Sequence, residues 1–290
     1  MATKTGGACM RNNAMRLHDA IEEWRLWGVS AKPELVHVFD QGLNHLTAKL
    51  QVDGEPRVLK VFSTANPHET RAQEIAAASG LAPALSYVDA AHRYVVMRLA
   101  VGSNPAPEQV CDEQIERIAD ALNSLHSLTL AHNQSDAFDL VWFCDGYLTT
   151  AGLKAQQLHQ DVLPYLEEFV EDPTPRCWCH NDLVVANMFV DTQRVQFIDW
   201  EYADLHNPWF DLAAVVLYLK LSRAQATVLL SRYARISAAQ VDTRIFFVSQ
   251  IALLWGDMLW HLAKFGESYW VEMQAKLDQL HALLHAVEKA

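Results

Sequence analysis

The chain has 290 residues, of which 51% are hydrophobic, and it carries a formal net charge of −12. This length and hydrophobic content predict a folded globular protein with room for two lobes of ordinary domain size. Such a negative charge argues against nucleic-acid binding as the main task, because proteins that bind a phosphate backbone normally present a basic face. The same negative field would attract a small cationic molecule.

The sequence predicts a cytoplasmic protein that does not insert into a membrane. Its five cysteines are scattered without a repeated spacing, and the opening stretch MATKTGGACMRNNAM lacks the apolar core of a secretion signal. No apolar run approaches the roughly 18 residues that a membrane-spanning helix needs. Asp257 interrupts the run IALLWGDMLW, and the run VVLYLK ends at Lys220.

The first hundred residues predict a strand-rich half. Residues 14–27 place apolar side chains three and four positions apart, which predicts an amphipathic helix that Gly28 closes. Period-two patterns then predict strands, the second and third of which are joined by a turn at Asp53-Gly54. The predicted strands are residues 35–40, 45–52, 56–62, 84–89 and 93–100.

A single helix is strongly marked within this half, at residues 66–79. Asn66 can cap it, Pro67 can occupy the first helical position, and Glu69 stands three residues after the cap. Gly80 follows the last helical residue, as is typical of helix ends.

The remaining residues predict a mainly helical half. Its exception is a small hairpin at residues 187–199, turning at Thr192-Gln193. We therefore expect an α+β fold with two lobes: residues 1–100, with a small antiparallel sheet and one important helix, and residues 101–290, larger and mainly helical.

A dense set of polar side chains lies around this hairpin. His180 and Asp182 are followed by Asn187 and then by Asp199, in the form HxDxxxxN…D. Phosphoryl transfer needs a carboxylate that orients the attacking hydroxyl and accepts its proton, with an Asn and a second carboxylate that hold Mg²⁺ on the nucleotide. Individually these residues could cap turns or end a strand. Their joint spacing favours the chemical interpretation.

These motifs resemble those of the protein-kinase-like small-molecule phosphotransferases, which include choline/ethanolamine kinases, thiamine kinase and aminoglycoside phosphotransferases. The resemblance covers about residues 36–275 and implies a bilobal protein-kinase-like fold that uses ATP and Mg²⁺. It implies that Asp182 is the catalytic base and that Asn187 and Asp199 bind the metal. His180 would be structural, and Asp211 of the FDLA motif would brace the catalytic loop, although it could also be a helix N-cap.

Lys60 lies in the apolar run VLKVF, where an ammonium group is costly unless it is paired. The resemblance implies that it contacts the nucleotide phosphates and is steadied by a helix Glu. Glu69 is already explained as the capping residue of the helix, whereas Glu74 lies in mid-helix. Glu74 is therefore the predicted partner of Lys60. A snorkelling lysine on an edge strand is the alternative.

Two further segments are predicted to bind the nucleotide. Gly42 and Asn44 resemble the family's Gly-x-Asn turn, whose backbone N–H groups would face phosphate. Met97 and Leu99 follow a predicted strand as the family's hinge does, where backbone groups could bind adenine. An ordinary strand end also explains the second pair.

The predicted acceptor is a small, cationic alcohol of the choline/ethanolamine or thiamine type. Trp255 resembles a tryptophan that walls the choline pocket, and Glu201 and Tyr202 could offer a carboxylate and a ring to a cation. Packing and a salt bridge are the alternatives for these residues. Alternative functions are aminoglycoside or sugar O-phosphotransfer, or a non-catalytic pseudokinase.

The run CWCH raises the question of a zinc site. Cys177, Cys179 and His180 alternate along an extended chain, but two cysteines one residue apart are not the usual zinc knuckle, and no second pair lies nearby. The sequence therefore favours buried thiols. His126 is likewise predicted to be a hydrogen-bonded core histidine.

Overall fold

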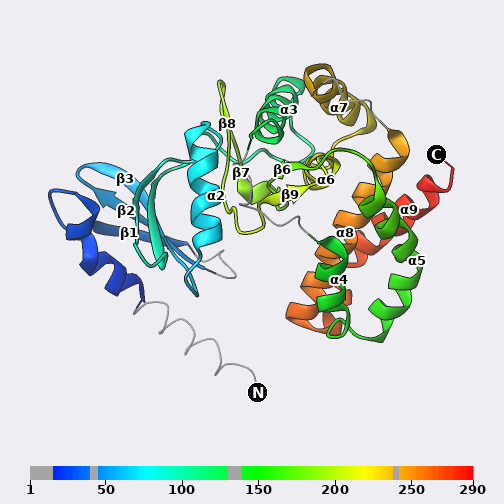
Figure 1. Ribbon diagram of the computed structural model, residues 1–290, viewed down its shortest axis with the longest axis horizontal. Helices are drawn as coiled ribbons and strands as arrows, with labels where there is room; N and C mark the ends of the chain where they lie inside the picture. The colour runs from blue at the N-terminus through cyan, green and yellow to red at the C-terminus, as the bar shows by residue number, and fades with distance from the viewer. Residues whose placement is uncertain (1–15, 40–44, 130–138, 238–241, 290) are drawn as a thin grey trace. The chain divides into compact units, whose positions relative to one another are not determined.

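A computed structural model describes residues 16–39, 45–129, 139–237 and 242–289 (Figure 1). The chain forms two compact units. The first comprises the residues up to Ser103 together with Asp191–Glu201, and the second comprises Asn104–Val190 and Tyr202–Ala290. The division differs from the one expected from sequence in two respects, because the first unit runs to Ser103 and not to residue 100, and because Asp191–Glu201 joins it.

The first unit is built on a five-stranded antiparallel sheet with the strand order β1-β2-β3-β5-β4. The strands are β1 (Glu34–Phe39), β2 (Leu46–Val52), β3 (Glu55–Val61), β4 (Leu85–Val88) and β5 (Tyr94–Arg98). The predicted tight turn joins β2 to β3, and both of its residues have positive φ, 49° at Asp53 and 82° at Gly54. This is the backbone that a two-residue hairpin turn requires.

One face of this sheet packs against the N-terminal helical segment. Residues 16–22 are helical and continue into the 3₁₀ helix η1 (Glu23–Trp27), after which Gly28 adopts φ 70°. Alternation along β3 points Leu59 and Val61 toward this core. Lys60 therefore faces the opposite side of the sheet.

The predicted helix on the other side is present as α2 (Pro67–Ala78) (Figure 1). Asn66 caps it, since its Oδ1 accepts a hydrogen bond of 3.0 Å from the Glu69 backbone N–H. Gly80 follows with φ 75°, which is the left-handed conformation common after helix ends. The capping residues thus place Glu69 in the first turn of α2.

The second unit is mainly helical, so the α+β fold class expected from sequence is confirmed. Its described α-helices are α3 (Asp112–His126), α4 (Leu140–Leu148), α5 (Leu153–Glu171), α6 (Trp209–Tyr218), α7 (Arg223–Ser237), α8 (Thr243–Phe265) and α9 (Gln274–Val287). Two 3₁₀ helices accompany them, η2 (Val185–Asn187) and η3 (Glu267–Trp270).

Short strands flank the residues of the polar motif, His180 to Asp199. β6 (Cys177–Cys179) pairs antiparallel with β9 (Asp204–His206), a pairing that the sequence did not predict. β7 (Met188–Val190) follows η2 and leads into the predicted turn, where the Asp191 N–H donates to the Arg194 carbonyl at 3.0 Å. β8 (Val195–Phe197) follows that turn and belongs to the first unit.

Helix α8 forms the centre of the second unit, in contact with α4, α5, α6 and α9 (Figure 1). Within the described part of the chain it is the one helix long and apolar enough to cross a bilayer, contrary to the sequence expectation. However, 78% of its most apolar window is buried inside the protein. Burial on this scale is what a core helix of a globular domain shows.

Candidate active site

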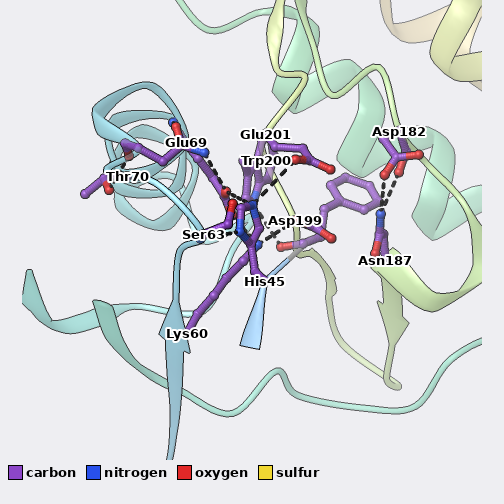
Figure 2. A network of polar contacts seen from close by, with 12 residues as sticks. His45, Lys60, Ser63, Glu69, Thr70, Asp182, Asn187, Asp199, Trp200 and Glu201 are labelled. Carbon is purple, nitrogen blue, oxygen red and sulfur yellow. Dashed lines mark hydrogen bonds and ion pairs between the residues drawn. The ribbon is translucent and has the colours of Figure 1, made fainter. Parts of the chain in front are cut away.

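The buried lysine of β3 lies among carboxylates within the first unit (Figure 2). Lys60 is 8% exposed, and its Nζ donates to Asp199 Oδ1 at 2.6 Å and to Glu69 Oε1. Burial alone would lower the pKa of Lys60, but the charges of Asp199 and Glu69 outweigh it and raise the pKa well above its usual range. Lys60 is therefore held as a cation that is fixed in place.

The prediction that Glu74 pairs with Lys60 is wrong, because Glu69 does so. Glu74 is exposed on the solvent side of α2. The sequence argument assigned Glu69 to capping alone, but a carboxylate has two oxygens. Oε1 accepts from Lys60, while Oε2 accepts from Asn66 Nδ2 at 3.1 Å, so one side chain serves both purposes.

A histidine that the sequence did not single out connects this network to Glu201. The His45 Nε2 lies 3.6 Å from Glu69 Oε2 and 3.6 Å from Glu201 Oε2. Its other ring nitrogen, Nδ1, accepts the Ser63 backbone N–H at 3.3 Å, which orients the ring. The signal in the sequence is its position immediately before β2 and directly after the predicted phosphate-binding turn.

These residues give the first unit a local excess of negative charge. The carboxylates of Glu69, Asp199 and Glu201 lie around Lys60 and His45. Burial raises the pKa of Glu69. The positive charge of Lys60 lowers this pKa, and the negative charge of Asp199 raises it further, so that the net change is upward. A divalent cation with oxygen ligands would neutralise this excess, so Asp199, whose side chain is 37% exposed, fits the predicted metal-binding role.

Within the second unit, Asn187 is tied to the predicted base (Figure 2). Its Nδ2 donates to the Asp182 backbone carbonyl at 2.9 Å and to Asp182 Oδ2 at 2.9 Å. Because both bonds use the amide nitrogen, the amide oxygen is directed away from Asp182. That oxygen is the atom with which Asn187 could bind Mg²⁺.

The loop that bears Asp182 is braced by Asp211 of α6. The carboxylate of Asp211 accepts the His180 N–H at 2.8 Å and the Asn181 N–H at 2.9 Å, and it contacts His126 Nε2 at 3.1 Å. Burial alone would raise the pKa of Asp211, but the hydrogen bond and charge of His126, together with His180 and its backbone N–H, hold the pKa below its usual range. Asp211 lies inside the first turn of α6 after Pro208, so the alternative N-cap role is not observed.

The brace holds a strained backbone in place. Asn181 has φ 63°, an uncommon conformation for a residue with a side chain. Its Nδ2 donates to the Tyr202 carbonyl at 2.8 Å, and its Oδ1 lies 2.9 Å from His206 Nδ1. His180 is fully buried, and its Nδ1 accepts the Asp182 N–H at 3.3 Å. These contacts are those of a structural histidine.

Asn104 is a further residue that the sequence did not suggest. Its Nδ2 donates to the carbonyls of Val185 (3.1 Å), Ala186 (3.1 Å) and Met188 (2.8 Å), which fixes the η2 turn containing Asn187. No local pattern marks it, since it lies about 80 residues earlier in a linker-like segment.

The predicted substrate role of Trp255 is not supported by the structure. Trp255 is fully buried in α8, and its indole N–H donates to His159 Nδ1 at 3.0 Å. A residue without exposed surface does not offer its face to a ligand, so packing explains this tryptophan. Tyr202 is half-buried, with its ring 6.2 Å from that of Phe143 in an edge-to-face contact.

The predicted nucleotide-binding segments are described only in part. Gly42 and Asn44 lie outside the described residues. Met97 is buried at the end of β5, and Leu99 is half-buried just after it. Their adenine-binding role stays a prediction.

Comparison with known proteins defines the class to which this fold and these motifs belong. Residues 36–243, more than half of the chain, match the model of the phosphotransferase enzyme family. The chain therefore belongs to this family of phosphotransferases.

Relatives at the sequence level are bacterial LicA proteins. Protein LicA of Haemophilus influenzae is 47% identical over 55 residues, a stretch that covers 19% of this chain and 21% of that protein. A LicA homolog of Mycoplasma capricolum is 22% identical over 163 residues, covering 56% of this chain and 66% of that protein. The chain thus matches only about a fifth of the Haemophilus protein's length.

Solved structures extend the similarity of fold to nearly the whole chain. A choline/ethanolamine kinase family protein from Mesorhizobium loti has a TM-score of 0.69 at 19% identity, covering 95% of this chain and 100% of that one. Choline kinase LicA from Streptococcus pneumoniae has a TM-score of 0.71 at 18% identity, covering 91% and 98%. A spectinomycin phosphotransferase bound to ADP and spectinomycin has a TM-score of 0.65 at 11% identity, covering 94% and 98%. At these identities the likeness concerns the fold.

Proposed function

We propose that this protein transfers the γ-phosphate of ATP, with Mg²⁺, to the hydroxyl of a small alcohol. The observation that carries this proposal is the fixed position of Lys60 between Glu69 and Asp199. A lysine steadied by a helix glutamate, beside a carboxylate that can hold metal, is the arrangement that kinases use to bind nucleotide phosphates. Membership of the phosphotransferase family supports the same conclusion.

Each residue then has a separate task. Lys60 neutralises phosphate charge, and Glu69 keeps the ammonium group in position. Asp199 and Asn187 offer oxygen ligands to Mg²⁺, which supplies charge neutralisation on the phosphates. Asp182 orients the acceptor hydroxyl and accepts its proton. Asp211 acts indirectly, because it holds the backbone of the segment that carries Asp182.

Choline or ethanolamine is the acceptor class that the proposal favours. LicA proteins are among the relatives that match at the sequence level, and one solved LicA is named a choline kinase. The formal charge of −12 would also draw a cationic alcohol toward the protein. Because Trp255 is buried, the proposal does not include an indole wall for the cation.

ADP release measured with a panel of acceptors tests this function. The panel contains choline, ethanolamine, thiamine, aminoglycosides and neutral sugars, each with Mg²⁺ and ATP. We expect acceptor-dependent turnover with an amino alcohol and a loss of at least about 100-fold in Asp182→Asn, since general-base catalysis contributes on the order of 10²–10⁴-fold.

Asp161→Asn is the matched control for this variant. Asp161 is exposed on α5 of the same unit, so the same change of charge should leave turnover unaltered. Turnover in Asp182→Asn above a tenth of the parent rate would remove this residue from the base role. Turnover only with sugars would overturn the acceptor class and leave the kinase assignment in place, whereas no turnover with any acceptor would favour a pseudokinase.

A further inference from the structure

The second unit brings together two thiols and an imidazole that the proposed function does not use. Cys177 and Cys179 point to the same face of β6, because alternate residues of a strand share a face. Their Sγ atoms are 3.6 Å apart. His126 at the end of α3 completes the group, and one ligand atom from each residue lies within 4.8 Å of the others.

The histidine in this group differs from the one that the sequence pattern suggests. His180 follows Cys179 directly, but its ring is engaged with the Asp182 N–H. His126 lies about 50 residues earlier on another element, so its contribution depends on tertiary structure.

The spacing of the sulfurs suits a tetrahedral metal ion. Zinc–thiolate bonds are about 2.3 Å long, so two sulfurs 3.6 Å apart would subtend an angle of about 103° at the metal, close to the tetrahedral value of about 109°. Thiolates and imidazole are also the ligands that zinc prefers. Two thiolates would balance the charge of a divalent ion, with two protons released to solvent on binding.

The surroundings of His126 match those of a metal-binding histidine. Such histidines commonly direct their second ring nitrogen to a carboxylate, which orients the ring. Here the Nε2 lies 3.1 Å from Asp211 Oδ2. The Nδ1 contacts the Tyr233 hydroxyl at 2.9 Å, a bond that metal binding would replace. Cys177 is partly exposed and Cys179 is buried, so an ion could enter past Cys177.

We propose that Cys177, Cys179 and His126 form a binding site for a thiophilic divalent cation, of which Zn²⁺ is the best fit. The site is separate from the oxygen ligands assigned to Mg²⁺. It is linked to the catalytic loop, because Asp211 also accepts the backbone N–H groups of His180 and Asn181. The proposal does not depend on the protein being a kinase.

Titration of the reduced, full-length protein with Co²⁺ tests this site. Excess Mg²⁺ in the buffer occupies sites made of oxygen ligands. We expect one equivalent of Co²⁺ to bind with a thiolate-to-cobalt charge-transfer band in the near ultraviolet, and Zn²⁺ to displace it. Replacing a residue that only hydrogen-bonds to a metal ligand lowers metal affinity roughly 10- to 100-fold, and replacing the ligand itself should lower it further. Cys177→Ser and Cys179→Ser should therefore each weaken binding by more than about 100-fold.

Cys111→Ser is the matched control, because Cys111 is an exposed free thiol of the same unit. It should leave both affinity and stoichiometry unchanged. Tyr233→Phe removes the hydroxyl that competes for Nδ1 and keeps the ring, so binding should be equal or tighter.

The spectrum of the parent protein tests the proposed metal site even where a variant folds poorly. Absence of a charge-transfer band in the parent would overturn the site, as would binding that persists unchanged in the double variant Cys177→Ser/Cys179→Ser.

Discussion

Replacing Glu69 by Gln removes one of the two carboxylates that hold Lys60. A hydrogen bond to a charged group contributes about 1.5–3 kcal/mol, and breaking a buried ion pair completely costs about 3–5 kcal/mol. Lys60 keeps its 2.6 Å bond to Asp199, and repulsion between the two carboxylates is relieved. We therefore expect a loss of about 2 kcal/mol, which is roughly a thirtyfold change in the local opening equilibrium.

Hydrogen exchange of the amides in β3 and α2 measures this local free energy directly. This assay suits the protein because a chain of two compact units need not unfold in a single two-state step. Glu74→Gln provides the control, since it makes the same chemical change on the exposed side of the same helix. Its effect should stay within about 0.5 kcal/mol.

The comparison of these two variants can refute the assignment. Equal protection losses in Glu69→Gln and Glu74→Gln would show that the change reflects helix charge and not the bond to Lys60. A larger loss in Glu74→Gln would restore the pairing that the sequence suggested. In the enzyme assay, Glu69→Gln should raise the KM for ATP, whereas Glu74→Gln should leave it unchanged.

Three further changes test other parts of the structure. Asp199→Ala should weaken binding of Mg²⁺-ATP, measured by calorimetry, and unchanged affinity would remove this residue from the metal site. Burial alone would raise the pKa of Asp257, but the bond from His261 and the charge of Lys276 hold it below its usual range. A lowered pKa means that the stabilisation is present above the unfolded value of about 3.9 and is lost as pH falls through the folded value. Asp257→Asn should thus destabilise the protein by about 1.5–3 kcal/mol at pH 7. Thermal melts should show that the difference in stability between the parent and this variant disappears below about pH 4. A difference that does not depend on pH would contradict the ion pair. Trp255→Phe should lower the melting temperature, since it leaves a buried hydrogen bond unmade, without altering the acceptor KM; a several-fold rise in that KM would return the residue to the substrate pocket.

Local features of this protein could be predicted from sequence because nearby residues determine them. Asn66 and Pro67 mark the start of α2, and Asp53-Gly54 supplies the positive φ values of the β2–β3 turn. The five predicted strands are present at nearly the predicted residues, and β2 shows alternating burial along most of its length. The predicted proximity of Asp182 and Asn187 is present as a direct contact, since only four residues separate them and Asn187 ends the short helix η2.

Pairings between distant residues were decided only by the tertiary structure. Both Glu69 and Glu74 were plausible partners for Lys60, and the choice depends on which face of α2 lies against the sheet. Trp255 carries a family-like sequence context, but its place at the centre of α8 buries it. His126 joins Cys177 and Cys179 because α3 packs beside β6. Side-chain direction and burial arise from packing between elements, which no local pattern specifies.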